Sequence, residues 1–366
     1  MLVLIDFEKA FDSISWNFLY ECLKLFGFSD NFIKWIKLFN NNITAYITQC
    51  GTLSDPINIM RGARQGDPIA TYEFIICAEV LSIMLKQTKE IKGIYVKEKE
   101  YKLTQFADDT TLFLDGTKKS LQSSLSVLEI FGSISGLKMN TDKTKIVWIG
   151  RKRFSKEKMS TSVPLSWGNN EFDLLGIHYT VNLSEITTHN YDKAITAIEK
   201  IVSTWSKRML TPFGKITIVK TFLLSKLNHL FVSLPTPPNS TIDKINNIFY
   251  KFLWDNKPDK LKRDLITQTY LDGGLKMVNI YNHITAIKTT WVRRLILDNG
   301  AIWIQFFNDS ILPTKNILSM GTDYYRKRKY THENPFWKDV FIAWHKLSVA
   351  LKIDSKYSHN HYGTIQ

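Results

Sequence analysis

Two adjacent carboxylates, Asp108 and Asp109, interrupt a segment that otherwise has the composition of a β-strand. Residues 99–106 alternate as a strand does, and residues 110–114 are β-branched, aromatic or apolar. Neighbouring side chains of a strand point to opposite faces, so two aspartates that act together require a turn of the backbone. The pattern therefore predicts a hairpin with Asp-Asp at its tip. For an isolated pair, an ordinary solvated turn is the simpler explanation, because aspartate is a common turn residue.

A third carboxylate, Asp6, ends the apolar run LVLI at residues 2–5, which fits a buried strand. A carboxylate at the edge of a core requires a partner, and a metal ion is one such partner. Further along, Asp67 and Pro68 suit the N-cap and first turn of a helix. The predicted buried stripe of that helix consists of Phe74, Ala78, Leu81 and Leu85. The preceding RGARQG, residues 61–66, predicts a flexible basic loop that suits a nucleotide or a template strand, although a plain Gly-Asp-Pro turn is the alternative.

The order of these patterns predicts the fold class. Strand, helix, loop, helix, hairpin, helix and strand follow one another, which is typical of an α+β domain with an antiparallel sheet and helices on one face. The helix after the hairpin should end at Gly136. Its predicted buried face consists of Leu121, Leu125, Leu128 and Ile134. From about residue 190 the pattern is helical, and a plain helical bundle accounts for it.

Composition narrows the choice of partner. The 366 residues include 48 Lys and Arg against 34 Asp and Glu, a formal charge of +14, which favours nucleic acid over an anionic membrane surface. The most apolar stretch, residues 74–85, is too short to span a bilayer, and the N-terminus lacks the basic region of a signal peptide, so we expect an intracellular protein without membrane association. The three cysteines lack CxxC spacing and nearby histidines, which indicates neither a zinc site nor a disulfide framework.

Five segments resemble motifs A to E of the reverse transcriptases of non-LTR (LINE-type) retrotransposons, in the family's order and at its separations. They are LIDFEKAFDS, RGARQGDP, FADDT, SGLKMNTDKTK and FDLLGI. Similarity to the family's thumb continues through residues 206–230 and ends near residue 295. The resemblance implies a polymerase palm at residues 1–185 and an all-α thumb at 186–260. It leaves a helical C-terminal region, 261–366, of unknown role.

The resemblance also implies an activity, that of an RNA-directed DNA polymerase. Two-metal nucleotidyl transfer needs carboxylates from separate segments around two divalent ions about 3.5 to 4 Å apart. Asp6, Asp108 and Asp109 would be both the catalytic residues and the metal ligands. Mg²⁺ is the expected ion, with Mn²⁺ as a substitute, because it prefers oxygen ligands and substrate phosphates. The implied partners are an RNA template, a DNA primer and dNTPs.

Further site residues follow by position in the same motifs. Phe11 stands where viral RNA-directed RNA polymerases typically place an acid that engages the ribose 2′-OH, and an aromatic ring there favours deoxynucleotides. Arg64, Gln65 and Gly66 would lie near the incoming nucleotide and template. Lys143 would donate a proton to pyrophosphate, and a solvated lysine in a basic turn explains it equally well. The nucleic-acid-binding cations of the thumb would be Lys207, Arg208, Lys215 and Lys220.

Departures from the family pattern qualify this expectation. The chain begins almost on motif A, so the fingers subdomain and an upstream endonuclease are expected to be missing, as is a C-terminal cysteine-rich knuckle. Ala70-Thr71 also replaces the Ser-Pro often found after QGDP. We therefore expect a truncated, weakly active or inactive copy, acting in the nucleus or in a cytoplasmic ribonucleoprotein. The alternatives are a non-catalytic RNA- and DNA-binding remnant, or an RNA-directed RNA polymerase-like palm enzyme, which Phe11 and FADD disfavour.

Overall fold

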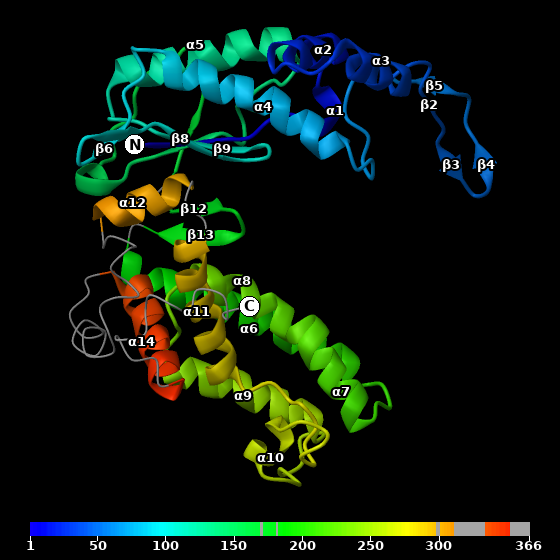
Figure 1. The fold of residues 1–366 in the computed structure, drawn as a ribbon, viewed down its shortest axis with the longest axis vertical. Helices are drawn as coiled ribbons and strands as arrows, with labels where there is room; N and C mark the ends of the chain where they lie inside the picture. Colours follow the sequence, from blue (N-terminus) through cyan, green and yellow to red (C-terminus); the bar gives the residue numbers. More distant parts are fainter. Residues whose placement is uncertain (169–170, 181, 298–300, 311–333, 352–366) are drawn as a thin grey trace. The chain divides into compact units, whose positions relative to one another are not determined.

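The computed structural model describes residues 1–168, 171–180, 182–297, 301–310 and 334–351. The chain divides into two compact units, Met1–Gly176 and Ile177–Gln366, drawn in Figure 1. The first unit combines a sheet with helices and the second is almost entirely helical, which confirms the predicted α+β class. The division of the chain into palm, thumb and C-terminal region stays a prediction.

The first unit is built on a five-stranded sheet whose central strand is the N-terminal one. In spatial order the strands are β11 (Ser166–Trp167), β10 (Lys145–Val147), β1 (Leu2–Ile5), β9 (Asp109–Phe113) and β8 (Leu103–Phe106). Strand β1 pairs antiparallel with both neighbours, and its Val3 lies opposite Ile146 on one side and Leu112 on the other. All three are at most 1% exposed, so the core-facing side of the central strand is buried.

The helices of the first unit share one hydrophobic core with this sheet. They are α1 (Ala10–Ser13), α2 (Trp16–Leu25), α3 (Asp30–Phe39), α4 (Ala70–Gln87) and α5 (Lys118–Ser135). Figure 1 shows α4 and α5 crossing the same side of the sheet. Their buried side chains join those of alternate sheet residues, such as Val3, Ile5 and Leu112, in one hydrophobic core. Alternation along a strand therefore directs Leu4 and Asp6 to the opposite face.

The predicted helix stripes are largely correct. Phe74, Ala78, Leu81 and Leu85 of α4 are all buried, as are Leu121, Leu125 and Leu128 of α5. Gly136 ends α5 with a left-handed φ of 83°. Ile134 was wrongly placed in the stripe, because it is 49% exposed. Asp67 was wrongly expected as the N-cap of α4: the helix begins at Ala70, and the Asp67 carboxylate instead accepts a hydrogen bond from the Ile69 amide in the preceding turn.

Short hairpins and turns complete the first unit. The paired strands are β2 (Thr44–Ala45) with β5 (Ile57–Asn58), β3 (Thr48–Gln49) with β4 (Thr52–Leu53), and β6 (Ile94–Val96) with β7 (Lys99–Tyr101). A 3₁₀ turn, η1 (Gly150–Lys152), follows β10, and β12 (Glu171–Leu174) lies near the end of the unit.

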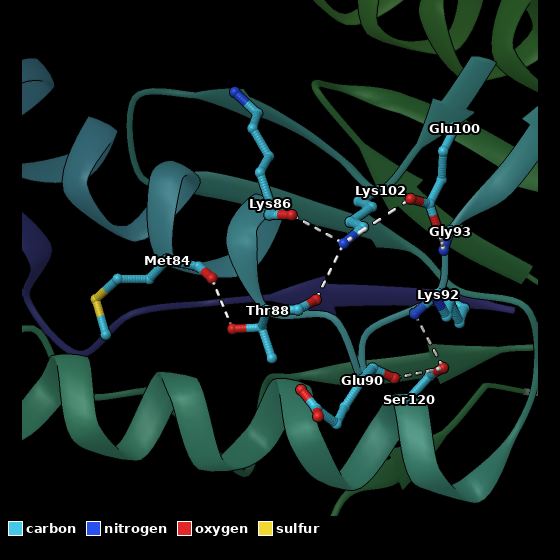
Figure 2. Close-up of polar contacts among 9 residues, drawn as sticks. All are labelled: Met84, Lys86, Thr88, Glu90, Lys92, Gly93, Glu100, Lys102 and Ser120. Carbon is cyan, nitrogen blue, oxygen red and sulfur yellow. Dashed lines mark hydrogen bonds and ion pairs between the residues drawn. The ribbon is translucent and has the colours of Figure 1, made fainter.

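Lys102 connects the end of α4 to the strands that lead into the Asp-Asp hairpin. Figure 2 shows that the Lys102 ammonium donates to the carbonyl oxygens of Lys86 and Thr88, at 2.9 and 3.1 Å, where α4 ends. It also lies 3.9 Å from the Glu100 carboxylate, which accepts a hydrogen bond from the Gly93 amide. A cation at a helix C-terminus satisfies carbonyl groups that have no partner within the helix. Lys102 therefore couples α4 to the start of β8.

The second unit contains β13 (Ile177–Thr180) and a series of helices. They are α6 (Leu183–Trp205), α7 (Pro212–Ile218), α8 (Leu224–Ser233), α9 (Asn239–Leu253), α10 (Arg263–Thr267), α11 (Ile280–Leu297), α12 (Ile302–Ser310) and α14 (Pro335–Ala350). Thr211 caps α7 by accepting a hydrogen bond from the Gly214 amide, and a π-helical turn, η2 (Val219–Leu223), joins α7 to α8. Across the residues that the structure describes, every helix is too short or too polar to cross a membrane.

We expect Lys102→Met to destabilise the first unit by about 1–3 kcal/mol, because it leaves two carbonyl oxygens and Glu100 without their charged donor. Hydrogen exchange of α4 and β8 peptides during urea unfolding measures this effect separately from the second unit. Lys119→Met, at an exposed position in the first turn of α5, is the matched control and should change stability by less than about 0.5 kcal/mol. Equal stability of the two variants would contradict the proposed coupling.

Candidate functional site

The Asp-Asp pair lies on a hairpin, as predicted. Strands β8 and β9 are antiparallel, and their last pair is Phe106 with Asp109, so Ala107 and Asp108 form the loop. Ala107 has a φ of 52°, in the left-handed region where a β-carbon costs about 1–2 kcal/mol. Gln105 donates a side-chain hydrogen bond to Thr110 across the hairpin. Asp108 is therefore held in a tight loop, and Asp109 begins the returning strand.

The sheet register brings Asp6 beside this hairpin. Leu4 pairs with Thr111 and Ile5 with Thr110, so one further residue along β1 places Asp6 next to Asp109. Both aspartates lie on the sheet face opposite the helical core, since Ile5 and Thr110 alternate with them. Carboxylates about a hundred residues apart in the sequence therefore occupy neighbouring positions on adjacent strands.

The electrostatics reflect this proximity. The pKa of Asp109 is raised above its ordinary value by burial, then by the negative charges of Asp108 and Asp6. Lys143 partly balances this negative charge, because its ammonium lies 3.9 Å from an Asp6 carboxylate oxygen. The Lys143 side chain is 71% exposed. The three carboxylates thus form a mutually repelling group that Lys143 approaches.

A short turn positions Lys143. The Asn140 side chain accepts hydrogen bonds from the amides of Asp142 and Lys143. The Asn140 amide donates to the Asp6 carbonyl at 2.8 Å, and the Asp6 amide donates to the Thr144 hydroxyl at 3.3 Å. Sequence reasoning did not identify Asn140 or Thr144. Asparagine commonly forms turns by accepting hydrogen bonds from backbone amides two or three residues further along the chain. The asparagine at position 140 was therefore a signal that sequence analysis could have used.

The three carboxylates are the kind of oxygen ligand that Mg²⁺ prefers, but they do not form a complete metal-binding site by themselves. Within the described ranges, no group of three or more His, Cys, Asp or Glu side chains lies in an arrangement that could hold a metal ion. Mg²⁺ usually retains several waters and is bound through one or two carboxylates together with substrate phosphates. Asp6, Asp108 and Asp109 offer such carboxylates, and their mutual repulsion favours a cation between them.

Phe11 lies in the segment that follows the first aspartate. Its ring stacks on that of Phe74 in α4, with centroids 4.3 Å apart and planes 18° from parallel. The Phe11 carbonyl accepts a hydrogen bond from the Ala63 amide, which joins this segment to the RGARQG loop. Gly62 permits that approach, because a β-carbon there would lie 2.7 Å from the Asp12 carbonyl oxygen.

The RGARQG loop borders an open hollow of about 480 Å³. It is lined by Phe39, Arg64, Gln65, Asp67, Pro68 and Ile69. The Arg64 guanidinium pairs with Asp67 at 3.2 Å, and Gly66 has a left-handed φ of 88° with open space on the side where a β-carbon would lie. Phe39, which is 46% exposed, was not identified from the sequence, and the helical repeat of aromatic residues in α3 was the available signal.

The predicted nucleic-acid-binding cations of the second unit differ in accessibility. Lys207, Arg208 and Lys220 are exposed, and the Arg208 guanidinium lies 4.5 Å from the centre of the Trp205 ring. Lys215 is only 4% exposed, and its ammonium pairs with Asp255 and donates to the Leu253 carbonyl. Including Lys215 was therefore wrong, because its charge is used inside the helical unit and does not face a phosphate backbone.

Comparison with known proteins identifies the first unit. A family model described as reverse transcriptase (RNA-dependent DNA polymerase) matches residues 1–179. Residues 1–179 belong to the reverse transcriptase family. This range contains the sheet, the Asp-Asp hairpin and the RGARQG loop. The match therefore covers the whole of the first unit.

Individual relatives indicate the kind of reverse transcriptase. The chain is 26% identical over 284 residues to the retrovirus-related Pol polyprotein from type-2 retrotransposable element R2DM of Drosophila melanogaster, covering 74% of this chain and 26% of that protein. It is 25% identical over 246 residues to the Pol polyprotein from type-1 retrotransposable element R2 of Popillia japonica, covering 64% and 38%. These matches confirm the prediction of a non-LTR retrotransposon reverse transcriptase.

A third relative extends further along the chain. The transposon TX1 uncharacterized 149 kDa protein of Xenopus laevis is 20% identical over 324 residues, which covers 87% of this chain and 24% of that protein. The chain thus spans between 24% and 38% of the length of these three relatives.

Asp109→Asn should stabilise the first unit at pH 7, because it removes a charge that burial and its neighbours disfavour. The raised pKa means that ionised Asp109 opposes folding above that pKa and that this cost disappears as the pH falls below the ordinary value of 3.8. Solvent screening limits the gain to less than about 1 kcal/mol. Unfolding should therefore show a difference at pH 7 and none at pH 3.

The control for this experiment is Asp55→Asn, an exposed carboxylate outside the group. Adding Mg²⁺ should raise the melting temperature of the wild type more than that of Asp109→Asn. A stability difference that persists unchanged at pH 3 would contradict the electrostatic explanation.

Proposed function

We propose that this reverse transcriptase carries out RNA-directed DNA synthesis by transferring dNTPs onto a primer 3′-OH at Asp6, Asp108 and Asp109. The observation that carries the proposal is the register of β1 with β9, which places Asp6 beside Asp109 on the face away from the core. Two-metal nucleotidyl transfer needs carboxylates from separate segments in one place. The family match covers all three residues.

The carboxylates would hold and orient the reacting groups. When bound, two Mg²⁺ ions, or Mn²⁺ in their place, would lower the pKa of the primer hydroxyl and neutralise charge on the triphosphate. Asp108 sits in a two-residue loop between paired strands, which limits its movement. Asp6 is fixed through its own backbone by Asn140 and Thr144. These constraints maintain the positioning on which such transfer depends.

Lys143 would donate a proton to the leaving pyrophosphate. Its ammonium is within 3.9 Å of Asp6 and largely exposed, so it can exchange that weak contact for an anionic phosphate. Arg64 is similarly available, because its pairing with Asp67 is on the surface beside the hollow. Together with Gln65 and Gly66, it would contact the incoming nucleotide and template.

Phe11 would select the sugar. Stacking on Phe74, itself 1% exposed, fixes the ring in place. An aromatic wall gives a ribose 2′-hydroxyl no hydrogen-bond partner and occupies the space that it needs, which favours deoxynucleotides.

The implied nucleic acids are an RNA template and a DNA primer. The net charge of +14 and the exposed Lys207, Arg208 and Lys220 suit a phosphate backbone. Because each of the three relatives is longer, a fingers or endonuclease segment of the same element would be a further partner. Such a complex would act in the nucleus or in a cytoplasmic ribonucleoprotein.

Primer extension on an RNA template with Mg²⁺ and dNTPs tests the proposed site. Asp108→Ala should reduce extension by at least about 10²- to 10³-fold, since removing one group that stabilises developing charge has effects of this size. Asp192→Ala, an exposed carboxylate on α6, is the matched control and should retain activity. Extension that survives Asp108→Ala would refute the site. Binding of primer-template without extension by the wild type would favour the non-catalytic alternative.

Phe11→Ala should lower the preference for dNTPs over rNTPs by about 10- to 100-fold, because it removes the wall against the 2′-hydroxyl. Single-nucleotide incorporation with each substrate measures this ratio. Phe11→Tyr keeps the ring and its stacking on Phe74, and it should keep the preference. Unchanged selectivity in Phe11→Ala would exclude Phe11 as the selecting residue, and strong incorporation of rNTPs by the wild type would favour the RNA polymerase alternative.

A further inference from the structure

A separate hydrophobic cluster, formed by α11, α12 and α14, lies outside the range that matches the reverse transcriptase family. Helices α11 and α14 run side by side in Figure 1 and make extensive contact. The cluster borders a hollow of about 600 Å³, a volume within the usual range for ligand sites. Its lining is mainly aromatic and includes Trp291, Trp303, Phe306, Phe336 and Trp337. The size and chemistry of this hollow suit a flat aromatic ligand.

Most of these rings are half-buried, so they offer faces or edges to a ligand. Trp291 is the centre of the group: Trp303 and Phe336 each meet its ring edge to face, with centroids 5.4 Å apart. Its indole nitrogen donates to the Val232 carbonyl, which fixes the ring to the end of α8. Phe306, on the rim, is 42% exposed. The aromatic walls are therefore held rigidly, which reduces the entropy lost on binding.

The charge at the rim is positive. The Arg294 guanidinium lies 4.9 Å from the centre of the Trp291 ring, and the residue is exposed. Among the described residues that line the hollow, Arg294 is the sole charged one and none is acidic. An arginine beside aromatic faces is the combination that holds an unpaired base by stacking and its phosphate by charge.

We propose that this hollow binds an unpaired nucleobase of a single strand of nucleic acid, with Arg294 contacting the adjacent phosphate. Proteins bind single strands by stacking bases on aromatic side chains within a basic surface. The net charge of +14 favours this ligand over an apolar or proline-rich peptide, for which a cation at the rim adds little. The choice of nucleic acid rests on the proposed function, whereas the site itself is separate from the carboxylates.

Fluorescence anisotropy with labelled oligonucleotides tests the site in the full chain. The probes are a twelve-nucleotide single-stranded RNA, the same sequence as DNA, and a blunt RNA–DNA duplex of that length. Trp303→Ala should weaken single-strand binding by about five- to 150-fold, the effect of losing one stacked base, and should leave duplex binding unchanged. Trp303→Phe, which keeps an aromatic face, should restore most of the affinity. Comparison of the RNA and DNA strands shows which of them the site prefers.

A matched pair of charge variants tests the site independently in case Trp303→Ala does not fold. Arg294→Gln should weaken single-strand binding, whereas Arg293→Gln, at the neighbouring exposed position of α11 outside the lining, should have a smaller effect. Equal losses in both variants would show general electrostatic attraction and overturn the proposal. So would unchanged affinity in Trp303→Ala and Arg294→Gln, or binding of a proline-rich peptide in place of either strand.

Primer extension separates this proposal from the polymerase site. Asp108→Ala should retain single-strand binding while losing extension, and Arg294→Gln should retain extension on a pre-annealed primer-template with a short unpaired template overhang beyond the primer 3′ end. If Asp108→Ala keeps extension but Arg294→Gln loses single-strand binding, the aromatic site stands and the proposed catalytic site fails. If Asp108→Ala loses single-strand binding to the same extent as Arg294→Gln, the two sites are not separate and this proposal fails.

Discussion

The antiparallel pairing of β1 with β9 is the constraint on which the site of the first unit depends. Val3 is buried between Leu112 and Ile146, so the hydrophobic core determines the register. A shift by one residue would turn Val3 and Ile5 away from the core and direct Asp6 into it. Burying an unpaired carboxylate is costly, and the core and the carboxylates therefore favour the same register. The packing of apolar side chains in the core thus determines the position of Asp6 beside Asp109.

Charge at the carboxylate group is balanced only in part. Lys143 is the cation that approaches Asp6, at 3.9 Å, and the pKa of Asp109 remains raised. Like charges held close together make an arrangement of this kind less stable than one with neutral residues. The left-handed Ala107 adds backbone strain next to Asp108. The charge repulsion and the strained backbone therefore both act against stability at this hairpin.

The sequence predicted the α+β class, the hairpin and the stripes of α4 well, because hydrophobic spacing and turn residues are local signals. The resemblance to reverse transcriptase motifs was needed to group the three aspartates with the RGARQG loop. Hydrophobic periodicity is a local signal and says nothing about distant segments. Lys215 could not be recognised as buried, since its partner Asp255 belongs to a distant segment. Whether the Ile134 side chain is buried depends on how far the core extends around α5, and the sequence does not show this. The aromatic hollow of the second unit is formed by tertiary packing of separate helices, and no motif marked it.

The central place of an N-terminal strand also has a consequence for biosynthesis. Leu2 pairs with Phe113 and with Val147, so β1 emerges from the ribosome long before either partner has been made. During that interval an apolar strand has both edges unpaired, a state that is prone to aggregation. Contacts of such large sequence separation also slow folding. Nascent chains of this protein should therefore depend on chaperones until the residues that form β10 have been synthesised.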